Sequence, residues 1–500
     1  MRPSIVLQRY DHGVPQLLME IRGLLYRCDG SVGDSYLPDR WAASSSLLPH
    51  HVAKQPSTVD INQRRRQHGY HISQQTYNRA NTHRSTHTMS ATVAPLKVLI
   101  SGGGIAGSCL AYCLARARRN VSITIIERSP VPRPTGQNLD IRGAALHIIK
   151  FMGMEDKIRD KTTKELGTTF LGLDGKTFAT LMGSDAFTAD FEILRADLAK
   201  VFLDATDRLS NVRYIYGDHV TSLEQDEKRV NVVTANGLKE TFDVFVAADG
   251  AASRTRAMFL DEETTKDSYH LLGQYIGFYS IPSQPDDPKL WQWYNIPKGL
   301  CIMMRPHRES PTRGVYLSIT LPAKGQRDPA IEAALKEGTA ATKRLLHDYF
   351  KDAGWEAERV LKGLDDSDDF YMATAAQVKL SNWHNNRCVV LGDAAHATFG
   401  IGTSLAIEGA YVLAGELSKI EGSQDVAQAL TNFQSIFMAH QKPQEEHLPG
   451  YPQLLFPQSS FGLWIRNTFL WLLCTSRVYK LMPNPASAPF KLPLYDWVKS

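Results

Sequence analysis

Short apolar runs alternate with a helical pattern near residue 100. Residues 96–101 (LKVLIS) and 121–126 (VSITII) are continuous apolar runs of the length that a buried parallel strand requires. The segment between them, SCLAYCLARARR, has the apolar spacing of a helix and carries arginines in its last turn. This strand–helix–strand order predicts an α/β domain built on a parallel sheet.

Two later apolar runs each end in an aspartate beside a glycine. Residues 242–250 (FDVFVAADG) and 387–395 (RCVVLGDAA) predict strands that end at Asp249 and Asp393, and a long helical pattern follows residues 400–404 (GIGTS). A carboxylate at a strand tip before a glycine-flanked helix start suits a sugar hydroxyl and a charged ring edge. Between residues 260 and 380, alternating segments such as GVYLSITL predict a second β-sheet.

The charge is unevenly distributed along this chain of 500 residues, whose composition is that of a folded globular protein. Residues 1–88 hold 11 Lys+Arg and 6 Asp+Glu, whereas the remaining 412 residues hold 45 and 46. The net charge of +4 therefore gives no reason to expect a nucleic-acid partner for the main body. We expect residues 1–88 to be disordered, or to be absent from the native protein because translation starts at Met89.

The cysteines and the C-terminal apolar segment bear on location. Six cysteines do not make a disulfide framework, and Cys109 and Cys113 favour buried thiols over metal ligands, which fits the cytoplasm; no metal site is expected. The segment FGLWIRNTFLWLLCTSRVY is too short between its arginines for the ~18–20 residues of a membrane span. It predicts a C-terminal helix packed on the body, and the alternative is peripheral membrane contact through Trp464 and Trp471.

A glycine motif carries the first specific chemistry. Gly102, Gly104 and Gly107 form G-x-G-x-x-G between the first strand and its helix, and Glu127 ends the second strand 20 residues after Gly107. Gly102 permits a tight turn, Gly104 lets the backbone approach a pyrophosphate, and Gly107 lets the helix pack on the strand. Glu127 can accept hydrogen bonds from ribose hydroxyls and disfavours a 2′-phosphate there. The motif alone leaves FAD and NAD open.

Together with the Asp249-Gly250 and Gly392-Asp393 motifs, this order resembles the class A FAD-dependent aromatic monooxygenases, with the para-hydroxybenzoate hydroxylase-like fold. Within that family it is most similar to tetracycline-inactivating monooxygenases and fungal secondary-metabolite hydroxylases, over roughly residues 95–480. The resemblance implies an α/β (α+β) fold with a discontinuous Rossmann-like FAD-binding domain, an inserted β-sheet substrate domain and C-terminal helices. The expected boundaries are 95–165, 190–255 and 380–430 for the FAD domain, 260–380 for the substrate domain and 430–500 for the helical closure.

The resemblance also assigns cofactor contacts. Beyond the glycine motif and Glu127, the FAD contacts fall on Asp140, Arg195, Asp249, Gly250, Asp393, Gly402 and Thr403. Gly402 and Thr403 would present backbone N–H groups to the isoalloxazine ring, and Arg133 would lie near the nicotinamide cofactor. The alternatives are a surface ion pair for Arg195 and a turn cap for Asp140.

The implied reaction uses NADPH, with NADH as the alternative, and O2. A flavin C4a-hydroperoxide would hydroxylate or epoxidise a small organic substrate, aromatic or of polyketide type. No catalytic side chain is assigned. Trp293 and Tyr294 are expected pocket residues, and His396 is expected to be a structural histidine with its hydrogen bonds satisfied.

Two other functions compete with this one. Flavin-dependent halogenases carry W-x-W-x-I-P, whereas this chain has one residue too many at 291–297 (WQWYNIP). An FAD-binding protein with impaired catalysis is the other alternative, because the connection between His396 and Gly402 is about three residues shorter than the family pattern and lacks its proline.

Overall fold

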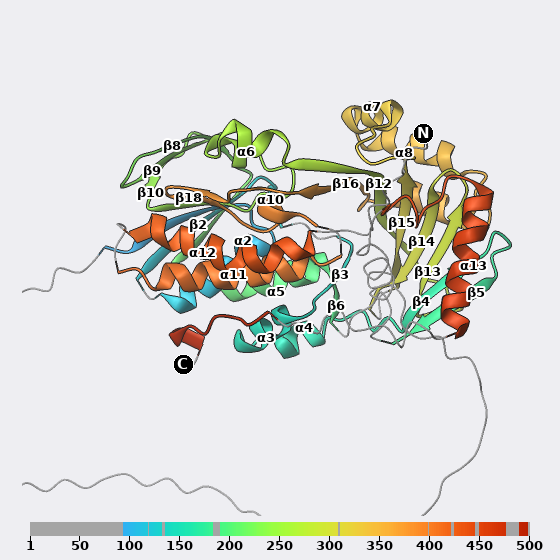
Figure 1. Cartoon of the computed structure of the whole chain (residues 1–500), viewed down its shortest axis with the longest axis horizontal. Coiled ribbons are helices and arrows are strands. Elements are labelled where there is room, and N and C mark those ends of the chain that lie inside the picture. Colours follow the sequence, from blue (N-terminus) through green and yellow to red (C-terminus); the bar gives the residue numbers. More distant parts are fainter. Residues whose placement is uncertain are drawn as a thin grey trace, which may run out of the picture. The chain divides into compact units, whose positions relative to one another are not determined.

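A computed structural model describes residues 94–118, 120–132, 136–183, 191–308, 311–398, 400–421, 425–445, 450–476 and 490–498. The predictions for residues 1–88 and for Arg133 lie outside these ranges. The expected mixed α/β fold is confirmed, with strands in four sheets and helices between them (Figure 1).

The predicted apolar runs form one six-stranded sheet. In spatial order its strands are β17 (His384–Asn385), β18 (Cys388–Val390), β11 (Val244–Ala247), β1 (Leu96–Ser101), β2 (Val121–Glu127) and β7 (Val212–Tyr216). All neighbours are parallel except β17 and β18. Because parallel strands end at one edge, the tips of β1, β2, β11 and β18 come together there.

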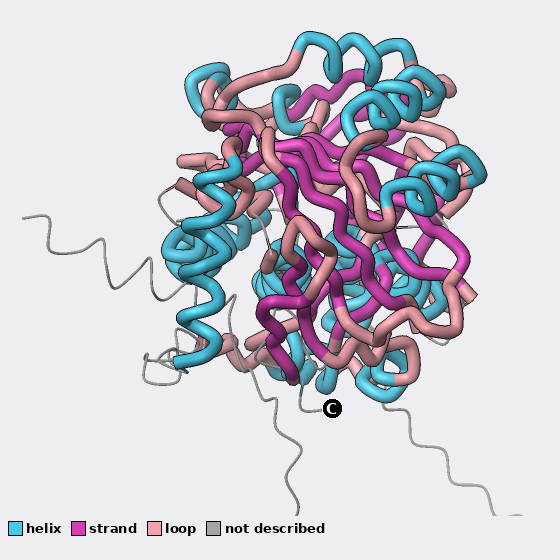
Figure 2. Tube along the Cα trace, turned by 90° about the vertical axis from the view of Figure 1, so that its right-hand side faces the viewer, coloured by secondary structure: helices cyan, strands magenta, loops and turns pink. Residues whose placement is uncertain are grey.

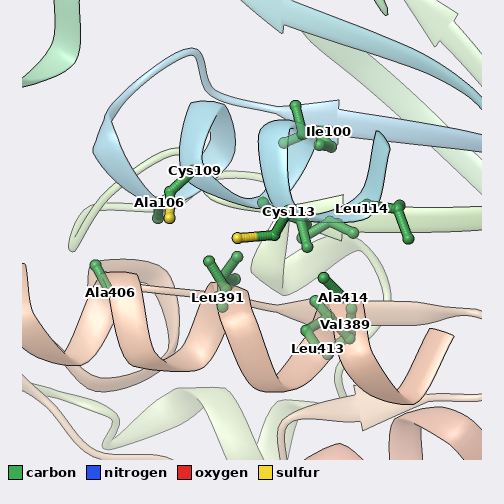
Figure 3. Packing of buried hydrophobic residues seen from close by; sticks show 14 of the residues in the cluster. Ile100, Ala106, Cys109, Cys113, Leu114, Val389, Leu391, Ala406, Leu413 and Ala414 are labelled. Atoms are coloured by element: carbon green, nitrogen blue, oxygen red, sulfur yellow. The ribbon is translucent and has the colours of Figure 1, made fainter. Parts of the chain in front are cut away.

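Helix α2 (Ile105–Ala117) packs against the long helix α11 (Gly402–Ser418), as Figure 1 shows. Figure 3 shows Cys109 and Cys113 of α2 among apolar side chains of α11 and β18, including Leu413 and Val389. Both thiols are free and fully buried, as expected, and burial raises the pKa of Cys109 well above its usual value.

Smaller elements surround this sheet. A three-stranded antiparallel sheet follows β7 along the chain, and two short strands, β3 and β6, pair antiparallel. These strands are β8 (Val220–Gln225), β9 (Val230–Thr234), β10 (Lys239–Phe242), β3 (Asn138–Asp140) and β6 (Glu192–Leu194). The accompanying helices are α3 (Ala144–Phe151), α4 (Glu155–Arg159), α5 (Arg195–Thr206), α6 (Glu262–Lys266), α10 (Asp393–His396) and α12 (Val426–Gln441), with the 3-10 turns η1 (Arg256–Met258), η3 (Lys442–Gln444) and η6 (Asp496–Val498).

A seven-stranded sheet forms the other half. In spatial order its strands are β16 (Tyr371–Val378), β12 (Tyr269–Pro282), β15 (Thr312–Thr320), β14 (Leu300–Pro306), β13 (Trp291–Ile296), β4 (Gly167–Leu171) and β5 (Thr177–Met182). Figure 2 shows its magenta strands side by side, flanked by cyan helices. Strands β4 and β5 come from a segment that the expected domain boundaries leave unassigned, and β4 joins parallel to β13.

The two faces of this sheet are covered differently. One face packs against α7 (Pro329–Glu337), α8 (Thr339–Phe350) and α9 (Ala357–Asp366), with Phe350 and Leu364 fully buried. The opposite face contacts α13 (Ser460–Ser476) through Leu470 and Leu473. As expected, this C-terminal helix packs on the body, yet Trp464 is 63% exposed. Within the ranges given above, no helix combines the length and apolar character needed to cross a membrane.

Candidate functional site

The turn between β1 and α2 depends on two of its glycines. Gly102 has a φ of +115°, and a Cβ there would lie 2.3 Å from the carbonyl oxygen of Ala248 at the end of β11. A Cβ on Gly107 would lie 2.1 Å from the carbonyl oxygen of Gly102. Neither position accepts a side chain without movement of the backbone, so the helix start is held close to the strand tips.

Gly104 differs from these two glycines. It has a φ of −75°, which any residue adopts, and no atom lies within 4 Å of the place where its Cβ would be. The space beside the helix start is therefore open, at the end where free N–H groups and the helix dipole favour an anion. This is the feature that a bound pyrophosphate requires.

Glu127 lies beside the same turn. Its Oε2 accepts a hydrogen bond from the backbone N–H of Gly103 at 2.9 Å, and its Oε1 accepts one from Ser129 N–H at 2.9 Å. Both bonds fix the orientation of the carboxylate, and each oxygen retains a second lone pair for another donor. The geometry therefore fits a carboxylate that accepts hydrogen bonds from ribose hydroxyl groups.

Asp393 opens α10 at the tip of β18. Its side chain is accessible to solvent, yet burial raises its pKa, and the charge of Arg195 partly opposes this shift. The carboxyl group of Asp393 is thus open to a ligand, while neighbouring protein atoms disfavour its charge. A Cβ on Gly402, the first residue of α11, would lie 3.4 Å from Asp393 Oδ1. The short connection after His396 thus still places the start of α11 beside Asp393.

The strand pair β3–β6 carries Asp140 and Arg195 at its opposite ends. Asp140 ends β3, and Arg195 follows β6 directly and donates its N–H to the carbonyl of Gln137 at 3.0 Å. Asp140 Oδ2 pairs with Arg142 at 3.1 Å, whereas its Oδ1 is buried and accepts no hydrogen bond from any described residue. A buried carboxylate oxygen without a donor is costly, so this atom fits a donor supplied by a ligand.

Asp249 is engaged within its own turn. It accepts hydrogen bonds from the side chains of Ser253 and Thr255 and from the backbone N–H groups of Arg254 and Thr255. Arg256, at the end of this turn, is buried and donates to the carbonyl of Ala394 in α10 at 2.8 Å. The structure thus gives Asp249 a role in shaping the turn, and its contact with a cofactor stays a prediction, as does that of Gly250.

The start of α11 is tied to the β3 segment by two residues that sequence reasoning missed. Ser404 Oγ accepts a hydrogen bond from Arg142 N–H at 2.9 Å, and Glu408 Oε1 accepts one from Ala145 N–H at 3.0 Å. Both lie within the first two turns of the helix that begins with Gly402 and Thr403. Their helical spacing on a buried face was the only signal in the sequence.

Aromatic side chains of the seven-stranded sheet meet the same segment. Tyr316 Oη accepts the N–H of Asn138 at 3.0 Å, and Tyr371 Oη bonds to the side chain of Gln137. Phe278 stacks on Tyr371 with ring centroids 5.0 Å apart and meets Tyr316 edge-on at 4.8 Å. We call Phe278, Tyr316 and Tyr371 the aromatic wall, which lies directly beside residues 137–138.

Two expectations about aromatic residues need correction. Trp293 and Tyr294 alternate along β13, so Trp293 packs on Phe456, while Tyr294 faces the helix-covered side and donates to the carbonyl of Ala353 at 2.9 Å. Consecutive residues of a strand cannot both line one pocket. His396 is buried as expected, but its two ring nitrogens have no hydrogen-bond partner among the described residues, and burial lowers its pKa to about 4.

The arrangement matches known proteins over most of the described chain. A model of the FAD binding domain matches residues 95–437. Monooxygenase CTB7 of Cercospora beticola is 34% identical over 417 residues, which cover 80% of this chain and 98% of that protein. Flavin-dependent monooxygenase eupH of a Phoma species is 32% identical over 431 residues, with the same coverage of 80% and 98%.

A solved structure shows the same fold. The tetracycline destructase Tet(51) is 26% identical and superposes with a TM-score of 0.63 over 80% of this chain and 100% of its own. These relatives do not support the halogenase alternative, and they indicate an oxidoreductase. The open space at Gly104, the Asp140 oxygen without a donor and the accessible carboxyl group of Asp393 all fit FAD.

Proposed function

The chain belongs to the family of FAD-dependent monooxygenases, and we propose that it inserts one oxygen atom of O2 into an aromatic or polyketide-type metabolite, with NADPH as the reductant. When bound, FAD supplies the chemistry that accepts electrons from the nicotinamide and activates O2. The protein binds and orients FAD and the substrate, and it excludes water from the site.

The aromatic wall is the observation that carries the substrate class. Phe278 and Tyr371 are both partly exposed and present stacked rings beside the segment that contains Asp140. Offset stacking on such rings favours a flat aromatic substrate over an aliphatic one. The name of the similar enzyme Tet(51), a tetracycline destructase, gives tetracycline as its substrate.

Each cofactor-binding residue has a distinct task in this proposal. The turn at 102–107 would hold the pyrophosphate at the start of α2, and Glu127 would accept the ribose hydroxyls of the adenosine. Asp393 would bind the hydroxyls of the ribityl chain, with Asp140 and Arg195 beside the flavin ring. The free N–H groups of Gly402 and Thr403 would stabilise negative charge that develops on the ring.

NADPH as the reductant rests on the family resemblance, with NADH as the alternative. Arg133, which would contact this cofactor, lies outside the described residues. The rate of flavin reduction under anaerobic conditions, measured with each nucleotide in turn, decides between them.

We also propose that the protein works in the cytoplasm and touches a membrane surface through α13. The five cysteines in the described ranges are free and buried, which supports a reducing compartment. Six large apolar side chains on one side of α13 are exposed: Phe461, Trp464, Ile465, Phe469, Trp471 and Leu472. Co-sedimentation with phosphatidylcholine–phosphatidylserine vesicles tests this, and the contact is rejected if replacing Trp464 and Trp471 with Gln changes nothing.

The reaction is tested by mass analysis of products formed under ¹⁸O2. Incorporation of one labelled atom into a phenolic polyketide, dependent on NADPH, supports the proposal, and products free of label reject it. Gly104→Ala serves as the matched variant, because the added methyl group meets no protein atom but fills the space of the pyrophosphate. We expect unchanged melting of the FAD-free protein and at least about tenfold weaker FAD binding.

A further inference from the structure

A buried arginine joins the two halves of the molecule. Arg305, near the end of β14, donates from Nε to Glu165 Oε2 at 3.0 Å and from Nη2 to Glu165 Oε1 at 3.2 Å. The same Nη2 lies 2.7 Å from Glu192 Oε1, at the start of β6. These side chains are 5%, 0% and 2% exposed, respectively. One guanidinium group thus connects the seven-stranded sheet to the β3–β6 pair.

The charges of this cluster do not balance. One guanidinium faces the two carboxyl groups of Glu165 and Glu192, and Asp140 nearby is paired with Arg142. Burial raises the pKa of Glu165 well above its usual value and also raises the pKa of Glu192, although Arg305 opposes both shifts. Burial disfavours the charge of Arg305, but attraction to the two glutamates raises its pKa overall. The guanidinium therefore stays charged.

The cluster reaches the cofactor side through β3. Glu192 accepts a hydrogen bond from the side chain of Asn138, and it lies opposite Asp140 in the strand register. Arg195 begins directly where β6 ends. Glu192 thus ties Arg305 to the strand pair that carries Asp140 at one end and leads into Arg195 at the other. On its other side, Arg305 covers the ring of Trp291, with its Cζ 4.0 Å from the ring centroid.

We propose that Arg305 is a positioning residue, which sets the place of the β3–β6 pair, and with it Asp140 and Arg195, against the sheet that carries the aromatic wall. This inference rests on the proposed function, because it names what aligns flavin and substrate. A rigid two-carboxylate contact suits the planar fork of arginine and not the single ammonium group of lysine.

A role in stability alone would not require this chemistry. Buried ion pairs are often no more stabilising than well-packed apolar residues of similar volume, because the desolvation of the charges is costly. One guanidinium group and two carboxyl groups with fixed hydrogen-bond directions do, however, define one relative placement of two sheets, which apolar contacts leave less well defined. The positioning role predicts a loss of function that exceeds the loss of stability.

Arg305→Lys is the main test, since it keeps the charge and loses the fork. We expect FAD to bind about tenfold more weakly, and a larger share of the NADPH consumed to yield hydrogen peroxide instead of product. FAD affinity is read from fluorescence quenching and thermal melting is measured without FAD, so neither readout depends on substrate. Unchanged FAD affinity and unchanged peroxide yield would overturn the proposal.

Arg466→Lys is the matched control. Arg466 in α13 is also buried, and its guanidinium donates to the carbonyl of Leu455 and lies over Phe170, within the same half of the molecule. We expect this variant to bind FAD like the unaltered protein, and equal weakening in both variants would overturn the proposal. If Arg305→Lys does not fold, Glu192→Gln replaces it, because glutamine still accepts from Asn138.

For Glu192→Gln we expect weaker FAD binding and a higher peroxide yield in a folded protein, and values equal to those of the unaltered protein count against the proposal. Failure of the proposed function gives a different result. It would remove the labelled product from the unaltered protein, while the difference in FAD affinity between the Arg305 and Arg466 variants would remain.

Discussion

The six-stranded and seven-stranded sheets prepare their binding surfaces in different ways. In the first, Gly102 and Gly107 bring the backbone close to the helix start, and the carboxylates of Glu127, Asp140 and Asp393 lie at the ends or starts of elements in that half of the molecule. In the second, the surface is made of side chains, with Phe278, Tyr316 and Tyr371 locked by hydrogen bonds and ring contacts. In our proposal, recognition of the cofactor thus depends on backbone geometry and a few carboxylates, whereas recognition of the substrate depends on aromatic side chains.

The largest effect is expected when the backbone contact of the first sheet is broken. Gly107→Ala places a methyl group 2.1 Å from the carbonyl oxygen of Gly102, so that the helix must move away from the strand. We expect a loss of about 4 kcal/mol or more in unfolding free energy, and protein without flavin. Urea unfolding and the flavin absorbance of the purified protein measure this. A variant that binds flavin and has normal stability would show that the close packing of Gly107 against Gly102 is not required.

The pH dependence of stability can be compared between the two halves. Each half contains one buried histidine, His396 or His307, and burial lowers the pKa of each to about 4. The unfolded chain binds these protons below pH about 6.5 and the folded chain does not, so stability is complete above pH 6.5 and decreases as the pH falls towards 4. For His396 this amounts to on the order of 3 kcal/mol. His396→Phe should flatten the stability curve between pH 4 and 6.5, and an unchanged slope contradicts this.

Removal of one ring from the aromatic wall tests the substrate half alone. We expect Phe278→Leu to raise the KM for an aromatic substrate about tenfold, because the stacked pair with Tyr371 is lost. FAD affinity should stay as it is, because the ring of Phe278 packs on Tyr316 and Tyr371 and not on a residue assigned to FAD. Steady-state kinetics and FAD titration on one preparation separate the effects on KM and on FAD affinity. A parallel loss of FAD affinity would contradict the assignment of Phe278 to substrate binding alone.

The smallest effect concerns the other face of the same sheet. Tyr294→Phe removes the hydrogen bond to the carbonyl of Ala353, which should lower the unfolding free energy by about 1 kcal/mol. KM and kcat should not change, because Tyr294 faces the helices α7–α9. A changed KM would place this residue in the substrate pocket after all.

Sequence reasoning succeeded where contiguous residues carry the signal. The strands at 96–101 and 121–126, the helix between them and the buried thiols follow from apolar spacing, and they are found as expected. The prediction that the hydrogen bonds of His396 are satisfied was wrong, because no pattern in the sequence shows which groups surround a buried ring. The alternation of side chains along a strand could have predicted that Trp293 and Tyr294 point to opposite faces. It could not have predicted which face the helices α7–α9 cover.

By itself, the sequence determined the first two parallel strands, the helix between them and the glycine turn that joins strand and helix. These are local features, and the apolar spacing and the positions of the glycines indicate them directly. Only the tertiary structure decided how the two halves meet. Arg305 and Glu165 are 140 residues apart in the chain, and Gln137 and Tyr371 are 234 apart. Such contacts depend on how whole sheets pack, and a single sequence carries no periodic signal for side chains that meet across that distance.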